Sequence, residues 1–569
     1  MDDLTPEHAM PRFTPVIAVV GNPTRPPAFT EEHLHALRAK GFDTVQLNIA
    51  WLSRPHDEPL NLRDVVRDEG EAEPPRVAER RAELARRSAL ARRLGFRTMF
   101  HIGSPFMWRD PATGEVRTPE GPDDTYYSDL EGEASRRFDV ADPRVAGHEL
   151  HLLARLRAAC PDIDDLLVYT YDQDAWQASE FGPSPFSRGV PLHERLPAYL
   201  ARLTDVWTRD RPGSTLWWEP WELSAGQVLA CVPHLPATSF GLCLHSNIAE
   251  VQIARPVDTW LRNTARAAAR RGIPIVAEAF LGANNEEIEP CALSTVRLVD
   301  EQLRALSGVE GVTGVKEYFG VDAQTTDLNL DLAAARLADP DAPFAALLAG
   351  VLDRNGLPAE VTAVLDRLDE AVQLIPWDTS WFLRKLGTGT PDHGWHAAII
   401  RGRVCTTPSW ESSRRGHFMK TDDDSPHVYL LEDVQLRCAL AADAFAESVA
   451  LLDHLPAGGG PAVERFATQT RDAAERLGRI VRGFALHLRE TLVVRTLRGD
   501  RDSGRPLTPR LCAELIDLLR ADVANTSGAP EPVAALHLAE TDLDAFLDTY
   551  LLPASESRRE LGLHAFTTA

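Results

Sequence analysis

The sequence predicts an α/β fold, a (β/α)8 TIM barrel followed by a mostly α-helical C-terminal domain. Three observations support this prediction. Over residues 13–320, short runs rich in β-branched and aromatic residues alternate with longer Ala/Leu/Arg-rich segments of helical periodicity. Eight such short runs occur in roughly 300 residues, which matches the strand number and the size of this barrel. Beyond about residue 340 the pattern is almost entirely helical.

The eight expected strands are, in chain order, residues 15–22, 43–51, 97–103, 166–174, 214–220, 239–246, 273–280 and 312–320. A helix is expected after each of the earlier strands. In the first of these helices, Thr30 is placed to cap the start and Gly41 to end it. A doubly wound open sheet is the alternative. It usually has fewer strands and a glycine-rich first turn, and "GNPTRPP" after the first strand lacks the G-x-G-x-x-G pattern.

These patterns divide the chain into a catalytic barrel domain, residues 1–335, and an α-helical C-terminal domain, residues 336–569. Within the second domain, residues 377–425 interrupt the helical blocks and are rich in Trp, His and Arg. Two interpretations of this segment stay open. It caps the mouth of the barrel, with Trp410 lining the pocket, or its aromatic residues pack the interface between the domains.

Composition limits the classes of partner. The net charge of −24 disfavours nucleic acid and anionic membranes, because binding to either depends on clustered positive charge. The N-terminus resembles no secretory signal, and no apolar run reaches the roughly 18 residues of a membrane span. The seven cysteines are scattered and lack C-x-x-C spacing. We therefore expect a cytoplasmic protein with reduced thiols and no metal or other cofactor. A homo-oligomer is compatible with the sequence.

Catalytic residues of a TIM barrel lie at the C-terminal ends of its strands. Every one of the eight expected strands finishes in a polar or ionisable residue. Side chains alternate between the two faces of a strand, so we expect Glu219 to share a face with Trp217, and Glu317 to share one with Val315. The polar residues expected to converge on one ring at the barrel mouth are Asn22, Asn48, His101, Asp172, Glu219, His245, Glu278 and Glu317.

The stretch "STLWWEPWELSAG" surrounds two carboxylates, Glu219 and Glu222, with three tryptophans. Sugar rings have apolar faces that stack on aromatic planes and hydroxyl groups that carboxylates bind. Cleavage of a glycosidic bond needs two carboxyl groups, one protonated and one ionised. A tryptophan beside Glu219 disfavours its charge, as a general acid requires. The pattern therefore favours glycoside hydrolysis.

The chain also resembles (β/α)8 glycoside hydrolases, in particular the layout of α-glucuronidase-like and β-hexosaminidase-like barrels. The resemblance rests on "FDVADPRVAGHELHLLARLRAACPDIDDLLVYTYDQD", where a phrase at residues 139–145 opens a long helix before an acidic strand end. It rests also on the order of a barrel and a helical C-terminal domain. The phrase lacks the usual Asn and Glu, and "DQDAW" stands where hexosaminidases have an Asp-Glu pair. The resemblance implies a glycosidase without naming the sugar.

We assign Glu219 as general acid/base and Glu278 as nucleophile or base, with Asp174 and Glu317 as substitutes. The expected substrate is a small oligosaccharide or a glycosylated metabolite. The residues expected to contact it are aromatic side chains that stack on sugar faces and polar side chains that bind hydroxyl groups: Asn48, His101, Tyr171, Asp172, Trp176, Trp217, Trp218, Trp221, Glu222, His245, Tyr318 and Trp410.

Two alternatives remain. In the first, Glu219, His245, Glu278 and Glu317, on four successive strands, form a ring of ligands for Mn²⁺ or Mg²⁺, resembling a xylose-isomerase-like sugar isomerase or epimerase. In the second, the barrel binds carbohydrate without catalysis. We favour the hydrolase, because the tryptophan density suits a larger glycoside.

Overall fold

The computed structural model describes residues 12–21, 29–49, 58–59, 61–103, 108–109, 116–117, 126–127, 137–169, 180–181, 185–220, 223, 225–246, 253, 256–283, 293–376, 428–456 and 458–549. Several residues assigned from the sequence lie outside these ranges, namely Asn22, Tyr171, Asp172, Asp174, Trp176, Trp221, Glu222, Trp410 and the whole 377–425 segment.

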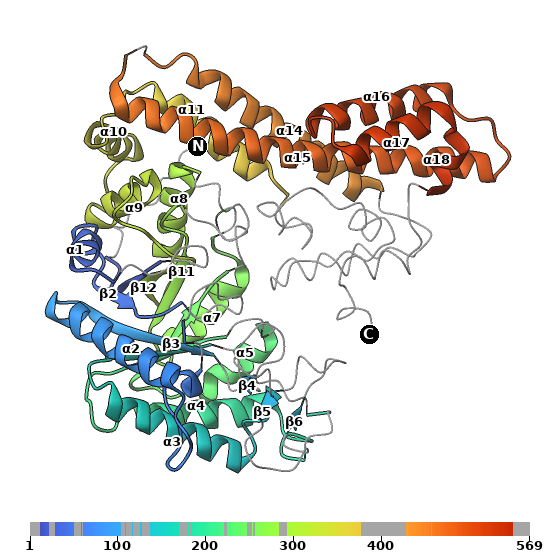
Figure 1. The fold of residues 1–569 in the computed structure, drawn as a ribbon. Coiled ribbons are helices and arrows are strands. Elements are labelled where there is room, and N and C mark those ends of the chain that lie inside the picture. The colour runs from blue at the N-terminus through green and yellow to red at the C-terminus, as the bar shows by residue number, and fades with distance from the viewer. Residues whose placement is uncertain are drawn as a thin grey trace, which may run out of the picture. The chain divides into compact units, whose positions relative to one another are not determined.

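Eight parallel strands close into a barrel, which confirms the predicted fold class (Figure 1). In chain order the strands are β1 (Val16–Val19), β2 (Thr44–Gln46), β3 (Arg97–Gly103), β8 (Asp165–Tyr169), β9 (Leu216–Glu219), β10 (Phe240–Leu244), β11 (Ile275–Ala279) and β12 (Val312–Glu317). Each strand falls within its expected range or begins one residue earlier, and β12 pairs with β1 to complete the circle. The open-sheet alternative is therefore wrong.

Helices follow the barrel strands in the order that a (β/α)8 fold requires. They are α1 (Glu31–Ala39), α2 (Pro75–Arg93), α3 (Pro143–Ala159), α4 (Leu192–Thr208), α5 (Ala225–Cys231), α7 (Thr259–Ala269), α8 (Val296–Ser307) and α9 (Leu328–Ala338). Thr30 caps α1 as predicted, since its hydroxyl accepts a hydrogen bond from the backbone N–H of His33 at 3.2 Å. Gly41, one residue beyond the C-cap, has a φ of 92°, which suits glycine at a helix end.

Short elements occupy some of the connections. Two small antiparallel hairpins, β4 (Trp108–Arg109) with β5 (Val116–Arg117) and β6 (Tyr126–Tyr127) with β7 (Arg137–Phe138), lie between β3 and α3 in the chain. Two 3-10 helices cover Leu62–Asp64 and Val232–His234.

The barrel interior is closed by one buried side chain from each of six strands. This cluster consists of Ile17, Met99, Leu167, Trp217, Cys243 and Val276. Because these residues come from different strands and contact one another, they identify the inward face of each strand. That assignment determines which of the strand-end residues enter the barrel.

The chain divides into two compact units. The first comprises residues 1–247, 255–282 and 299–343, and the second comprises 248–254, 283–298 and 344–569. The boundary predicted between residues 335 and 336 falls inside α9, which belongs entirely to the first unit. None of the helices in the described ranges is both long enough and apolar enough to cross a lipid bilayer.

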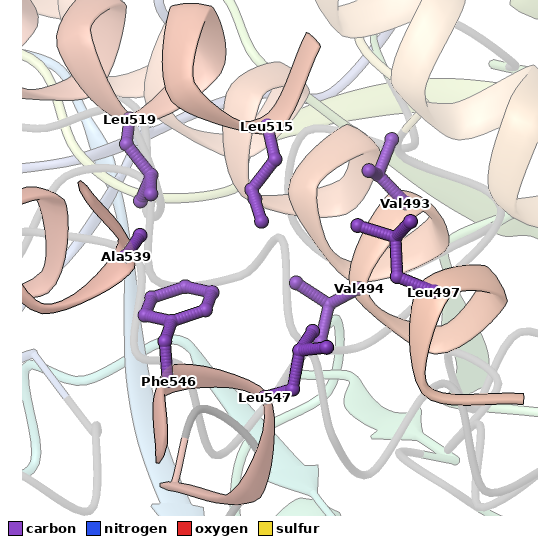
Figure 2. Close-up of a cluster of buried hydrophobic side chains, with 8 residues drawn as sticks. All are labelled: Val493, Val494, Leu497, Leu515, Leu519, Ala539, Phe546 and Leu547. Carbon is purple, nitrogen blue, oxygen red and sulfur yellow. The ribbon is translucent and has the colours of Figure 1, made fainter. Parts of the chain in front are cut away.

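The second unit is helical in its described part. It contains α10 (Phe344–Arg354), α11 (Val361–Leu374), α14 (Val428–Leu452), α15 (Gly460–Asp502), α16 (Pro509–Asn525), α17 (Pro530–Thr541) and α18 (Leu543–Thr549). Helix α14 packs along both α11 and α15. Figure 2 shows how the C-terminal end of α15 joins α16, α17 and α18 through a cluster of buried apolar side chains, to which Val494, Leu515 and Phe546 belong.

Candidate active site

The candidate site lies at the C-terminal end of the barrel strands, where TIM-barrel enzymes carry out their chemistry. Glu219 is the last residue of β9, and Glu278 and Lys316 are the next-to-last residues of β11 and β12. Trp217 and Val276, two residues earlier on β9 and β11, belong to the interior cluster. Because side chains alternate, Glu219 and Glu278 also point inward, as expected from the sequence.

Glu278 is paired with a lysine. The register between β11 and β12 sets Glu278 directly beside Lys316, so the two side chains leave the sheet on the same face. The ammonium Nζ of Lys316 donates a 2.6 Å hydrogen bond to Oε1 of Glu278. Both residues are 3% exposed. The other oxygen of Glu278, Oε2, is buried and has no hydrogen-bond partner among the described residues.

Glu219 lies close to Glu278 and to a histidine. One carboxylate oxygen of each glutamate and the thiol Sγ of Cys243, on the intervening strand β10, lie within 4.8 Å of one another. Nε2 of His101, on β3, is 3.7 Å from Oε2 of Glu219. We call Glu219, Cys243, Glu278, Lys316 and His101 the carboxylate cluster. It brings together five strands of the barrel.

The charge states in this cluster follow from burial and from Lys316. Burial lowers the pKa of His101 well below its usual value, and the positive charge of Lys316 lowers it further, so the imidazole is neutral. Burial also opposes the charge of Lys316, but the negative charges of Glu278 and Glu219 outweigh it and raise the pKa of the ammonium. Burial, with the charge of Glu278, raises the pKa of Cys243 well above normal, so the thiol stays protonated.

Two further residues position His101. Asn48, which follows β2, binds the backbone of His101 through its side-chain amide. The ring of Tyr169, at the end of β8, meets the imidazole edge-on with 4.8 Å between ring centroids. Tyr169 shares its face with Leu167 of the interior cluster. The sequence suggested Asn48 as a group that binds sugar hydroxyls, whereas its amide is occupied by backbone groups.

Glu317 differs from its expected position. Lys316, and not Glu317, is the inward residue at the end of β12, so Glu317 lies on the opposite face, with Val315. Its carboxylate accepts hydrogen bonds from the backbone N–H groups of Leu281, Phe319 and Gly320, at 2.8, 3.0 and 3.1 Å. Burial raises its pKa to about 7, despite these hydrogen bonds. Glu317 thus links the segment that follows β12 to the segment that follows β11 through hydrogen bonds.

The side chains of Trp217 and Trp218 on β9 likewise point to opposite faces of the sheet. Trp217 points into the barrel, where its ring occupies the space left by Gly241: a Cβ atom on this glycine would lie 2.3 Å from the ring. Trp218 is fully buried and lies on the other face of β9, between the sheet and its surrounding helices. The structure therefore places Trp218 outside the site, and its expected role in stacking on a sugar does not fit this position.

The other two described candidates are His245 and Tyr318, which follow β10 and β12. Both are 2% exposed. The ring of Tyr318 packs against Phe280, which follows β11, with ring centroids 4.9 Å apart.

A metal ion fits this arrangement poorly. Glu219, Cys243 and Glu278 form the one group of potential ligands with suitable spacing in the described ranges. However, the Lys316 ammonium already neutralises Glu278, and the raised pKa of Cys243 keeps its thiol protonated, whereas metal ligands must be deprotonated. The ring of four ligands considered for an isomerase is also broken, because Glu317 faces away from it.

Sequence reasoning missed Lys316 and Tyr169. The signal for Lys316 was available, since the chain has only four lysines, at positions 40, 316, 385 and 420, and uses arginine elsewhere. A lysine near the end of a buried strand is costly unless it pairs with a carboxylate. In "VTGVKEYFG", however, the alternation of faces is compatible with Lys316 or Glu317 pointing inward.

The chain is similar in fold to a solved glycoside hydrolase structure. A GH138 enzyme targeting pectin rhamnogalacturonan II aligns with a TM-score of 0.55 and 10% sequence identity, over 92% of this chain and 63% of that one. This chain thus spans less than two thirds of that enzyme's length.

Weaker likenesses exist to an O-GlcNAc hydrolase of Thermobaculum terrenum (TM-score 0.39, 9% identity, 98% of both chains) and to a family 5 glycoside hydrolase of Prevotella bryantii (TM-score 0.35, 12% identity, 60% of this chain and 97% of that one). Neither a protein-family model nor a curated protein matches the sequence. The likeness is one of fold, and the shared fold is the TIM barrel.

Proposed function

We propose that the protein is a glycoside hydrolase that cleaves the glycosidic bond with Glu219 and Glu278. The observation that supports this most directly is the separation of the two carboxylates, whose oxygens approach within 4.8 Å at the C-terminal end of the barrel. Retaining glycosidases have carboxyl groups about 5–5.5 Å apart, whereas inverting enzymes need about 6.5–9.5 Å to admit a water molecule. The spacing therefore favours retention of the anomeric configuration.

Glu278 is suited to the role of nucleophile. Its carboxylate accepts the hydrogen bond from Lys316, and the positive charge beside it favours the ionised form that attacks an anomeric carbon. The second oxygen, Oε2, makes no hydrogen bond to any described residue. Glu278 therefore has one oxygen held in place and another available to react.

Glu219 is suited to the role of general acid and base. It shares the inward face of β9 with the indole of Trp217, and the imidazole near it is neutral. An indole and a neutral imidazole beside a buried carboxyl group favour the protonated form that a general acid requires.

The proposed reaction has two steps. In the first, Oε2 of Glu278 forms a bond to the anomeric carbon while the bond from that carbon to the leaving oxygen breaks, and Glu219 transfers its proton to the leaving oxygen. In the second, Glu219 takes a proton from water, the water oxygen bonds to the anomeric carbon, and the bond to Glu278 breaks. The products are a free sugar and the released group, and Glu219 is protonated again.

The test is a panel of 4-nitrophenyl glycosides of both anomers, assayed with the wild-type protein and with Glu219→Gln and Glu278→Gln. Each variant should lose at least about 1,000-fold in kcat, because each removes a group that takes part in bond cleavage. Glu149→Gln is the matched control, since Glu149 is a buried glutamate of α3 that belongs to no part of the proposed mechanism. Absence of cleavage for every glycoside, or full activity of Glu278→Gln, would contradict the proposal.

Two finer points belong to the same proposal. Retention is tested by ¹H NMR of the first product formed from the cleaved glycoside, whose anomer should match that of the substrate. We also propose, from the sequence, that the natural substrates are small oligosaccharides or glycosylated metabolites. Faster release of sugar from short oligosaccharides than from the corresponding polysaccharide supports that substrate class, and the reverse order contradicts it.

A further inference from the structure

We propose that Lys316 is the positioning residue that gives the two glutamates different roles: it holds Glu278 as the charged carboxylate and leaves Glu219 as the group that carries the proton. The catalytic half of this inference rests on the proposed function. The statement that Lys316 keeps Glu278 charged applies to the folded protein and can be tested without any catalytic activity.

The geometry of the cluster is asymmetric. Glu278 and Lys316 are register partners on adjacent strands, and the ammonium lies 2.6 Å from the carboxylate. Glu219 is separated from β12 by two strands, and Nε2 of His101 lies 3.7 Å from its Oε2 atom. The single ammonium of the carboxylate cluster is therefore hydrogen-bonded to one of the two glutamates.

This asymmetry matters because two nearby carboxylates compete for one proton. When two acids interact strongly, the proton belongs to the pair, and the surroundings determine which acid holds it. Burial disfavours the charged form of both glutamates here, since Glu219 is 4% exposed and Glu278 is 3% exposed. The hydrogen-bonded ammonium stabilises the charge on Glu278, so the proton resides on Glu219.

Lys316 does not itself act as a nucleophile. The negative charges of Glu278 and Glu219 raise the pKa of its ammonium, so no free amine is present near neutral pH. It forms no bond in the proposed reaction and acts through Glu278. A purely structural role for the buried pair is the competing explanation, since buried ion pairs also occur where they only hold strands together.

The first experiment needs no substrate. Lys316→Met removes the charge and keeps an unbranched side chain, and Lys316→Arg keeps the charge. The midpoint of thermal unfolding is followed from pH 4.5 to pH 9 by tryptophan fluorescence. Eight of the twelve tryptophans of the chain belong to the first unit, so the fluorescence signal comes mainly from the barrel.

We expect Lys316→Met to lose stability relative to the wild type progressively as the pH rises. Without the ammonium, burial favours the protonated form of Glu278 in the folded state. When folding raises the pKa of an acid, the folded protein loses stability as the pH rises above the pKa of the unfolded state, roughly 4.3 for Glu. The loss reaches its limit once the pH exceeds the pKa of the folded state. Lys316→Arg should follow the wild type, and the double variant Lys316→Met/Glu278→Gln should show no such pH dependence.

Lys40→Met is the matched control, because Lys40 also pairs with a carboxylate, that of Asp331, but at a partly exposed site. Its effect should be small at every pH. A gap between the wild type and Lys316→Met that stays constant from pH 4.5 to pH 9 would overturn the proposal in favour of a structural role.

The second experiment uses the 4-nitrophenyl glycoside that the wild type cleaves fastest. The acidic limb of the profile of kcat/KM against pH should move to higher pH by one unit or more in Lys316→Met. It should stay in place in Lys316→Arg and in Lys40→Met. An unchanged limb in Lys316→Met, with Glu278→Gln inactive, would overturn the inference and leave the proposed function standing. If no glycoside is cleaved, the proposed function fails, and the unfolding series still decides the charge of Glu278.

Discussion

The side-chain amide of Asn48 makes hydrogen bonds to both backbone groups of His101, the N–H and the carbonyl. Oδ1 of Asn48 accepts a hydrogen bond from the His101 N–H at 2.9 Å, and Nδ2 donates one to the His101 carbonyl at 2.7 Å. The second hydrogen of Nδ2 reaches the carbonyl of Pro59 at 2.8 Å. Strand β2 ends at Gln46, so this side chain continues the pairing with β3 where the backbone no longer does. It thereby fixes the strand position from which His101 projects toward Glu219.

Replacement of Asn48 by alanine should therefore destabilise the barrel. The change removes the hydrogen bonds that Asn48 makes to the N–H of His101 and to the carbonyls of His101 and Pro59, and each buried group left without a partner costs about 1–3 kcal/mol. Urea unfolding measures the change in the free energy of unfolding. Thr325→Ala is the control, because the Thr325 hydroxyl makes one exposed hydrogen bond, and its loss should change stability by no more than about 0.5 kcal/mol. Equal stability of Asn48→Ala and the wild type would show that the amide does not support β3.

Glu317→Gln should destabilise the protein without removing a reacting group. A glutamine has one carbonyl oxygen, so its NH₂ group must face at least one of the three backbone N–H groups that the carboxylate now binds, at a cost of about 1–3 kcal/mol. The pKa of Glu317 is raised to about 7, so the wild type loses stability as the pH rises from about 4.5 through 7. The gap between the two proteins should consequently be larger at pH 5.5 than at pH 8.5.

Gly241→Ala tests the packing of Trp217. The added Cβ would lie 2.3 Å from the indole ring, and overpacking of this kind typically costs about 1–3 kcal/mol. Gly147→Ala is the matched control, since Gly147 lies inside α3 with open space around the new methyl group, and alanine there should add about 0.5–1 kcal/mol. Both values come from urea unfolding. Trp217→Leu should relieve the clash, so the double variant with Gly241→Ala should lose less than the sum of the single losses.

His487 and Asp522 make the second unit sensitive to pH. The Nε2 atom of His487, on α15, lies 3.1 Å from Oδ2 of Asp522, on α16, and both residues are buried. Burial opposes the histidine charge, but the hydrogen bond to Asp522 and the negative charges of Glu490 and Asp522 outweigh it and raise the pKa of His487. A histidine whose pKa is raised by folding contributes its full stabilisation below about pH 6.5, the pKa of the unfolded state. This stabilisation is lost as the pH rises through the pKa of the folded state.

The stability advantage of the wild type over His487→Gln should therefore be larger at pH 6 than at pH 8.5. Circular dichroism at 222 nm, measured during urea unfolding, follows the helices of both units, and the comparison with a control variant isolates the effect of the pair. His537→Gln, on α17, is the control because it resides in the same unit outside this pair. An advantage that grows with pH would contradict a protonated histidine at this position.

The sequence alone was sufficient to predict the barrel and the position of Glu219 and Glu278 at one end of it, and the reason is periodicity. Eight short runs separated by helices define the strands, and the polar end of each run marks the rim where Glu219 and Glu278 meet. What the sequence could not determine was the face presented by residues near a strand end. For β9 the assignment of Trp217 and Glu219 to the interior was right, whereas for β12 the inward residue is Lys316 and Glu317 points outward.

A similar uncertainty applies to side chains whose chemistry permits two roles. Asn48 carries donors and an acceptor that suit a sugar as well as a peptide bond, and in the folded protein the peptide groups of His101 and Pro59 occupy them. For Trp218 the run "LWWE" places two indoles in succession, so one of them must leave the barrel interior.

The neighbouring positions of Lys316 and Glu317 on β12 restrict how this barrel can change during evolution. A slip of the strand by a single position would exchange the two side chains, bringing a third acid inward and expelling the ammonium. An insertion before Val312 is therefore tolerable only where the segment between α8 and β12 takes up the extra residues and the register of the strand is unchanged.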